Sequence, residues 1–264
     1  MFPSRIWLRF ENRYRETQSY LKQRRPGTMT NTKPLISFTF DDVPKSSCTL
    51  GREILEGFGL RATYYLSLAL MDSVYSIGPA FSRIDLDRII AGGHEIGSHT
   101  FGHLDAWSTS ADVFKASLHE NQRMLDKISP GRVFETFSYP LNTPHPRIKK
   151  IAGDLYLCCR GGGQTYNLKT VDLSLLKSYF IDGRNRDDLN GLKKIIDESC
   201  EKRGWLIFST HDIDEHPSPY GCAPKVFEDL ARHADRSGSS ILTVRESVLC
   251  SIRLPQKVRM PEKA

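Results

Sequence analysis

Three apolar runs of the sequence end in side chains that can bind a metal ion or transfer a proton. "ISFTFDD" ends in Asp41 and Asp42, "HEIGSHTFGH" supplies His99 and His103, and "WLIFSTHD" supplies His211. Carboxylate and imidazole groups are zinc ligands, and they are also frequent general acids and bases. If each run is a strand, the three groups gather at one edge of a sheet, where metal binding and proton transfer would be combined.

Each group has a chemical interpretation and an alternative. One of the adjacent aspartates holds a cation while the other stays ionised as a general base, or one of them caps the following turn. His99 and His103, four residues apart, form with one aspartate a ligand set that leaves positions open on zinc. His211 suits a general acid for a departing amine, and the alternatives are a third metal ligand or a core histidine.

The third histidine of the same stretch, His94, stands apart from the other two. It opens the predicted strand that His99 closes, and at ~3.3 Å per residue the two lie roughly 16 Å apart. One ion cannot bind both. We therefore expect His94 to be a buried, hydrogen-bonded structural residue.

The elements that position these groups alternate between strands and helices. Amphipathic patterns predict helices at 111–128 and 187–204. Such alternation indicates parallel βαβ units in one α/β domain, and the absence of G-x-G-x-x-G after the first strand favours an incomplete barrel over an open doubly wound sheet. The predicted strands are 35–40, 62–68, 94–99, 134–139, 155–159, 175–181, 205–210 and 240–244.

The composition is that of a soluble globular protein. The 264 residues are 39% hydrophobic and 26% charged, and no apolar run is long enough to span a membrane. The net charge of +6 comes from the ends, because residues 1–33 hold eight basic and two acidic residues whereas residues 34–252 hold 25 and 28. A body without excess positive charge argues against nucleic acid as a partner. No export signal is visible, so we expect a cytoplasmic protein with reduced cysteines.

The N-terminal segment, residues 1–33, differs in composition from the body at 34–252. Trp7, Phe10, Tyr14 and Leu21 fall at helical spacing, and the following "RRPGTMTNTK" is typical of a linker. The helix either packs on the outside of the body or rests on an anionic membrane surface at the inner face of the membrane. Residues 253–264 form a basic C-terminal tail.

The motifs together resemble a known family. "ISFTFDD", "GGHEIGSHTFGH", "FSYP" and "WLIFSTHD", in this order, are similar to the NodB-type polysaccharide deacetylases, carbohydrate esterase family 4. The resemblance covers residues 35–250. It implies an irregular, incomplete (β/α) barrel in a single domain, and metal-dependent removal of an N-acetyl group from an amino sugar.

The resemblance also implies a role for each site residue. Asp41 would be the general base, His211 the general acid, and the backbone N–H of Tyr139 a donor to the oxyanion. One divalent metal ion is implied, with Zn²⁺ expected and Co, Ni, Mn or Fe as alternatives. Its ligands would be Asp42, His99 and His103.

The sequence departs from the family pattern in two places. The third motif, "ETFSYPLN", lacks the arginine that orients the base in many members, and Arg160 in "CCRGG" is a candidate substitute from a later strand. The aspartate that tunes the acid histidine in many members also has no clear equivalent. Asp172 in "TVDL" is a candidate, with a turn residue as the alternative.

The expected substrate is a saccharide or saccharide precursor of surface polysaccharide or O-antigen biosynthesis. Arg184 and Arg186 could reach a phosphate of a nucleotide-linked or lipid-linked sugar, or they belong to a solvated loop. We expect Tyr220 near the sugar and Trp107 in the core. Two other functions stay open: an amide hydrolase such as a deformylase acting on a lipid-linked aminosugar, and a non-catalytic carbohydrate-binding descendant.

Overall fold

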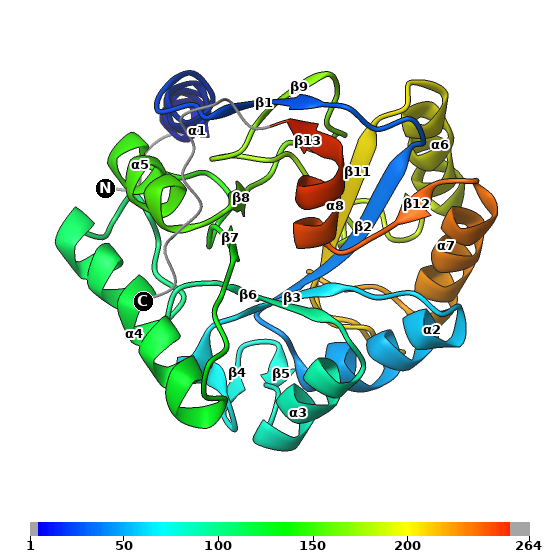
Figure 1. Ribbon diagram of the computed structural model, residues 1–264, viewed down its shortest axis with the longest axis horizontal. Coiled ribbons are helices and arrows are strands. Elements are labelled where there is room, and N and C mark those ends of the chain that lie inside the picture. The colour runs from blue at the N-terminus through cyan, green and yellow to red at the C-terminus, as the bar shows by residue number, and fades with distance from the viewer. Residues whose placement is uncertain (1–4, 254–264) are drawn as a thin grey trace.

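The centre of the protein is a curled sheet of eight strands surrounded by helices (Figure 1). This computed structural model describes residues 5–253, and side chains from residue 10 onward. The strand order is β10-β11-β2-β3-β6-β7-β8, with β12 beside β2, and every pairing is parallel. The strands are β2 (Leu35–Asp41), β3 (Thr63–Leu66), β6 (Glu95–Ser98), β7 (Thr136–Ser138), β8 (Cys158–Arg160), β10 (Tyr179–Phe180), β11 (Trp205–Thr210) and β12 (Ser240–Ile241).

Helices cover the outside of this sheet, which confirms the predicted irregular, incomplete (β/α) barrel in a single domain (Figure 1). Every residue of β2 and β11 is buried, as expected for parallel strands covered on both faces. The helices are α1 (Arg5–Leu21), α2 (Arg52–Gly57), α3 (Arg83–Ala91), α4 (Ala111–Ile128), α5 (Pro146–Leu155), α6 (Leu189–Glu201), α7 (Pro224–Arg236) and α8 (Val244–Ser251), with short turns η1 (Ser47–Gly51) and η2 (Leu68–Leu70).

All eight predicted strands exist, but several are shorter than predicted. The run 155–159 begins inside α5, so β8 starts only at Cys158. The run 175–181 is reduced to the two residues of β10, because the Asn167 side chain binds the backbone of Lys177 and takes the place of a ladder hydrogen bond. The predicted helix 111–128 agrees exactly with α4.

The prediction of a linker after the N-terminal helix is wrong. Pro26–Met29 forms β1, which pairs antiparallel with β9 (Thr170–Asp172) and with β13 (Ile252–Arg253). Gly27 permits this pairing, since a Cβ there would lie 2.7 Å from Ile252 Cγ2. The small sheet therefore joins the segment after α1 to the C-terminal end of the described chain. The turn residues of 24–33 predict a linker instead. A third sheet, the hairpin β4 (Val74–Tyr75) and β5 (Gly78–Pro79), projects beside the barrel.

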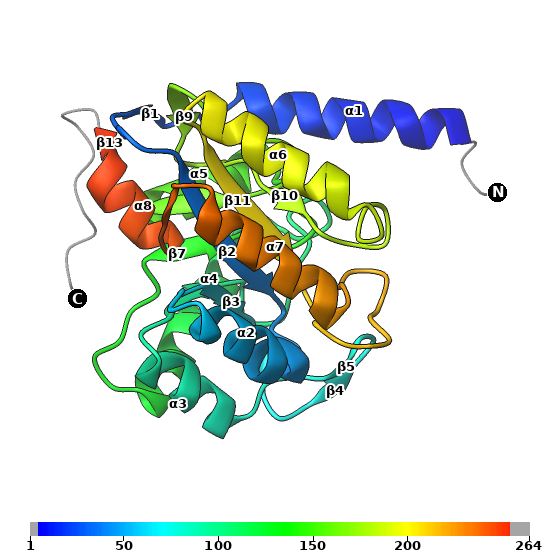
Figure 2. The ribbon, with the colours of Figure 1, turned by 90° about the vertical axis from the view of Figure 1, so that its right-hand side faces the viewer.

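The N-terminal helix α1 exists as predicted and packs against α5 by its C-terminal end. Ser19 is fully buried and donates to the Pro144 carbonyl, and the Lys149 ammonium donates to the carbonyls of Ser19 and Lys22. In Figure 2 the other end of α1 extends past the rest of the protein. No helix of residues 5–253 is long and apolar enough to cross a membrane. The predicted C-terminal tail lies outside the described residues beyond Arg253.

Candidate active site

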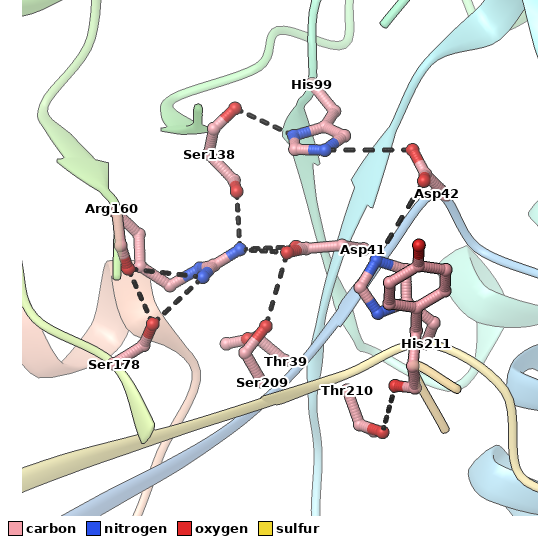
Figure 3. Close-up of polar contacts among 12 residues, drawn as sticks. Thr39, Asp41, Asp42, His99, Ser138, Arg160, Ser178, Ser209, Thr210 and His211 are labelled. Atoms are coloured by element: carbon pink, nitrogen blue, oxygen red, sulfur yellow. Dashed lines mark hydrogen bonds and ion pairs between the residues drawn. The ribbon is translucent and has the colours of Figure 1, made fainter. Parts of the chain in front are cut away.

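Asp41, Asp42, His99, Arg160 and His211 meet at one rim of the barrel (Figure 3). Asp41 and Arg160 are the last residues of β2 and β8, and His99 and His211 directly follow β6 and β11. The carboxyl ends of parallel strands share one edge of the sheet, so four distant segments contribute to one site.

A cavity of about 590 Å³ opens at this rim, within the size range of small-molecule sites. Its walls combine the strand ends with the β4–β5 hairpin and the segments that follow β7, β10 and β11. The lining residues are Asp41, Asp42, Tyr75, Ser76, Ile77, His99, His103, Tyr139, Leu141, Asn142, Phe180, Asp182, Gly183, Arg184, His211, Pro219 and Tyr220.

Asp42, His99 and His103 form a group with the geometry of a metal site. One ligand atom from each lies within 4.8 Å of the others, and Asp42 Oδ1 is 3.7 Å from His99 Nε2 and 3.5 Å from His103 Nε2. Two ligands held ~2.1 Å from one ion in tetrahedral geometry are about 3.4 Å apart. Asp42 Oδ1 is also buried without any hydrogen-bond partner among the described residues, an arrangement that is costly unless a cation satisfies it. The group therefore fits a divalent metal ion.

The hydrogen bonding of His99 prepares it as a ligand. Its Nδ1 lies 2.8 Å from the Ser138 carbonyl oxygen, which can only accept, so Nδ1 carries the proton and Nε2 presents a lone pair to Asp42. Burial lowers the pKa of His99 to about 4, although Asp41 and Asp42 act in the opposite direction. The ring is therefore neutral at pH 7, the form that binds metals.

Backbone strain is concentrated at this rim. Asp42, His103, Leu141 and Asn142 all have positive φ angles, of 56°, 51°, 57° and 67°. Residues other than glycine rarely adopt this backbone conformation, and Leu141 is the least suited to it of the four. Such strain typically collects where a site requires a particular side-chain direction.

Asp41 is held by a buried ion pair with Arg160. The Arg160 guanidinium Nη2 donates to both carboxylate oxygens and to Ser138 Oγ, while Nη1 donates to Ser178 Oγ at 3.0 Å. Ser209 Oγ donates to Asp41 Oδ2 at 3.2 Å. Burial by itself raises the pKa of Asp41, but the positive charges of Arg160 and the nearby histidines lower it to about 2. Asp41 is therefore a fixed anion at neutral pH, and Arg160 occupies the position proposed for it from the sequence.

His211 faces the metal group from the opposite wall. Its Nε2 is 3.9 Å from Asp42 Oδ2, and the Tyr220 ring lies 5.5 Å from the imidazole, between centroids. His211 Nδ1 is buried and has no partner among the described residues. Figure 3 shows the imidazole pointing toward Asp41 and Asp42, so it can reach a group bound between them.

The prediction that Asp172 tunes His211 is wrong. Asp172 belongs to β9 in the small sheet, where it pairs with Lys149 and accepts from the Arg25 N–H. Asp182, which lines the cavity together with His211, is placed where Asp172 was expected. Burial raises the pKa of Asp182, but the bonds from Arg184 and the charge of His211 produce a net lowering. Asp182 directly follows the apolar run 175–181, so the strand-end argument could have found it.

The backbone N–H of Tyr139 is not available to a substrate, contrary to the expectation. It donates to the Arg160 carbonyl at 3.0 Å, and the Tyr139 hydroxyl donates to the Ser174 carbonyl at 3.0 Å. Two residues further on, the N–H of Leu141 has no acceptor within residues 5–253, and Leu141 lines the cavity. The free donor of the third motif is therefore at Leu141, because the chain turns only after Pro140.

The remaining predicted residues divide between the cavity and the scaffold. Arg184 lines the cavity beside Tyr220, whereas Arg186 Nη1 donates to three carbonyls of the 217–221 loop and so fixes that loop. Trp107 is half-buried and contacts α1 rather than the barrel core. His94 accepts from the Ala62 N–H at 3.0 Å and bonds Glu56 at 3.2 Å, the structural role expected for it.

Comparisons with known proteins agree with this fold. The family model described as polysaccharide deacetylase matches residues 28–157. A chitin deacetylase of Pestalotiopsis sp. is 30% identical over 101 residues, which are 38% of this chain and 31% of that protein. The chain thus matches about a third of that relative's length.

Solved structures share the fold over most of the chain. The chitin deacetylase from the fungal pathogen Colletotrichum lindemuthianum superposes with a TM-score of 0.58 at 17% identity, over 83% of this chain and 89% of that one. A pseudoenzyme of family CE4 from Bacillus anthracis gives 0.55 at 13% identity, over 82% and 66%. The polysaccharide deacetylase model thus matches just under half of the chain, and the solved structures share its fold.

Proposed function

We propose that the protein is a metal-dependent hydrolase that removes the N-acetyl group of an amino sugar and releases acetate and a free amine. The observation that carries the proposal is the unpartnered, buried Asp42 Oδ1, which faces two histidine nitrogens beside the ion-paired Asp41. A metal ion held by Asp42, His99 and His103 would polarise the amide carbonyl and lower the pKa of a bound water toward ~7. Zn²⁺ suits this ligand set best.

The protein's own residues then divide the proton transfers between them. Asp41, kept anionic and oriented by Arg160, accepts the proton of the attacking water. His211, on the other side of the cleft, donates a proton to the departing nitrogen, because an amine leaves poorly as its anion.

The negative charge that develops on the carbonyl oxygen must be stabilised by a hydrogen-bond donor. The Leu141 N–H supplies it, in place of the Tyr139 N–H, which is already bonded to Arg160. Removing one such donor typically costs about 3 kcal/mol of transition-state stabilisation. The positive φ of Leu141 directs this part of the backbone toward the cavity, which gives the strain a function.

The substrate we propose is a cytoplasmic saccharide precursor that carries phosphate, of the kind used for surface polysaccharide or O-antigen. Among the described residues that line the cavity, Arg184 is the one arginine or lysine, and its side chain is 67% exposed although it pairs with Asp182. An exposed guanidinium at the mouth suits a phosphate oxygen. The relative from Pestalotiopsis is a chitin deacetylase, which supports an N-acetylated sugar at the reacting position.

Acetate release from a panel of N-acetyl sugars, free, polymeric and nucleotide-linked, tests the proposal. Metal-loaded protein should release acetate from at least one class, and a chelator should stop the reaction. Asp41→Asn, which keeps the shape but not the charge, is the inactive control. If formate is released instead from an N-formyl sugar, the protein is a deformylase. If no acyl group is released from any of them, the protein is a non-catalytic binding descendant. If Asp41→Asn is equally active, Asp41 is not the general base and the proposed mechanism fails.

A further inference from the structure

Helix α1 carries a stripe of exposed apolar side chains. Phe10, Tyr14 and Leu21 have exposed fractions of 66%, 59% and 69%. Their spacing of four and seven residues places them on one side of the helix, and Ser19, nine residues after Phe10, points the opposite way and is fully buried. A helix that packs on a globular body normally turns its apolar side inward. In α1 three apolar side chains instead lie on the exposed side, and the polar Ser19 is buried.

Helix α1 also contacts the loop that follows His103. In Figure 2 the helix runs along the upper edge of the protein and its N-terminal half extends past the body, whereas the β4–β5 hairpin lies at the lower edge. The Trp107 ring, four residues after His103, is 6.3 Å from the Tyr14 ring and lies 5.2 Å from the Arg15 guanidinium carbon. The helix is thereby fixed to the loop that carries a metal-binding residue.

The charge of the segment indicates what the stripe contacts. Residues 5–22 contain five lysines and arginines against two glutamates, while the body is slightly acidic. An aromatic stripe combined with basic residues is the pattern of helices that lie in the headgroup region of anionic membranes. A second copy of this chain would bring the same positive charges together, which disfavours self-association through α1.

We propose that α1 is a docking surface for an anionic lipid bilayer. The stripe of Phe10, Tyr14 and Leu21 enters the interfacial region, and the basic residues of the helix contact the headgroups. This inference is independent of the acyl group removed and of the metal.

Co-sedimentation of the full-length protein with vesicles tests this surface. The wild type should bind vesicles of phosphatidylcholine mixed with phosphatidylglycerol, should bind pure phosphatidylcholine vesicles more weakly, and should lose affinity as salt is raised. Phe10→Ser/Leu21→Ser should weaken binding at least about tenfold. Tyr14 and Arg15, which contact Trp107, are kept in this variant, so acetate release from a soluble substrate should be unchanged.

A matched control removes equal apolar exposure elsewhere. Ile84→Ser/Val133→Ser changes side chains that are 63% and 49% exposed on other parts of the body, and it should bind vesicles like the wild type. The proposal is overturned if the wild type binds neither vesicle, if the α1 variant and the control bind equally, or if the stripe instead produces a concentration-dependent dimer that Phe10→Ser/Leu21→Ser abolishes in light scattering.

Discussion

Arg160 and Asp41 form a fully buried ion pair between the last residues of two strands that are not neighbours in the sheet. The third motif, "ETFSYPLN", contains no arginine. The guanidinium that holds Asp41 comes from β8, which pairs with β7, and the small Ser138 side chain at the end of β7 accepts one of its hydrogen bonds. The arginine that contacts Asp41 is therefore supplied by a strand other than the one that carries the third motif.

This arrangement predicts that an arginine at residue 138 can partly replace Arg160. Arg160→Ser should lower kcat by about 10²-fold or more, and it should destabilise the fold by about 3–5 kcal/mol, because Asp41 is left buried without its partner. Adding Ser138→Arg should restore part of both losses, since residue 138 borders the space that Arg160 fills. Acetate release and thermal unfolding of the single and double variants measure the two effects. A fully active Arg160→Ser variant would refute the assignment.

Variants of the three histidines of "HEIGSHTFGH" should differ in the amount of metal that they bind. His99→Asn and His103→Asn each remove one of three ligands and should abolish stoichiometric zinc binding. His94→Gln should retain it, because His94 bonds Glu56 and the Ala62 N–H away from the metal group. Metal analysis of the folded, gel-filtered variants measures this. Loss of zinc from a folded His94→Gln protein would contradict the division.

The pH dependence of stability should report on His94. Burial is the main cause that lowers the pKa of His94 below 6.5, although Glu56 acts in the opposite direction. As the pH falls below about 6.5, the unfolded chain binds a proton that the folded protein does not, so the free energy of unfolding decreases. Denaturant titrations of chelated protein between about pH 7 and 5.5 should therefore give a steeper loss of stability for the wild type than for His94→Gln. Equal slopes would mean that His94 titrates alike in both states.

Most of the site was predictable because strand ends obey a simple geometric rule. An apolar run followed by Asp or His places that side chain at the carboxyl edge of a parallel sheet, and this rule identified Asp41, His99 and His211. The same rule applied to the run 175–181 would have identified Asp182. Arg184 and Arg186 follow Asp182 in the sequence, and their charge favours an interpretation of this loop as a phosphate-binding segment.

Other features required three-dimensional information. Which N–H of "SYPLN" is free depends on where the chain leaves the sheet, and only the structure shows that Tyr139 still pairs with β8 while Leu141 does not. The strand β1 was read as a linker because Pro26 and Gly27 are turn residues. Its pairing partners lie far along the chain, and no local pattern reports such a contact.

The role of His211 predicts a difference between two leaving groups. An alcohol departs far more readily than an amine, so a general acid matters less for an ester than for an amide. His211→Asn should therefore lower kcat for an N-acetyl sugar by about 10²–10⁴-fold, and should lower it much less for the matching O-acetyl sugar. The metal group should be unaffected, since His211 is not among Asp42, His99 and His103. Acetate release from the two substrates, measured on the same zinc-loaded variant, gives the comparison. Equal losses on both would assign His211 to metal or substrate binding instead of proton donation.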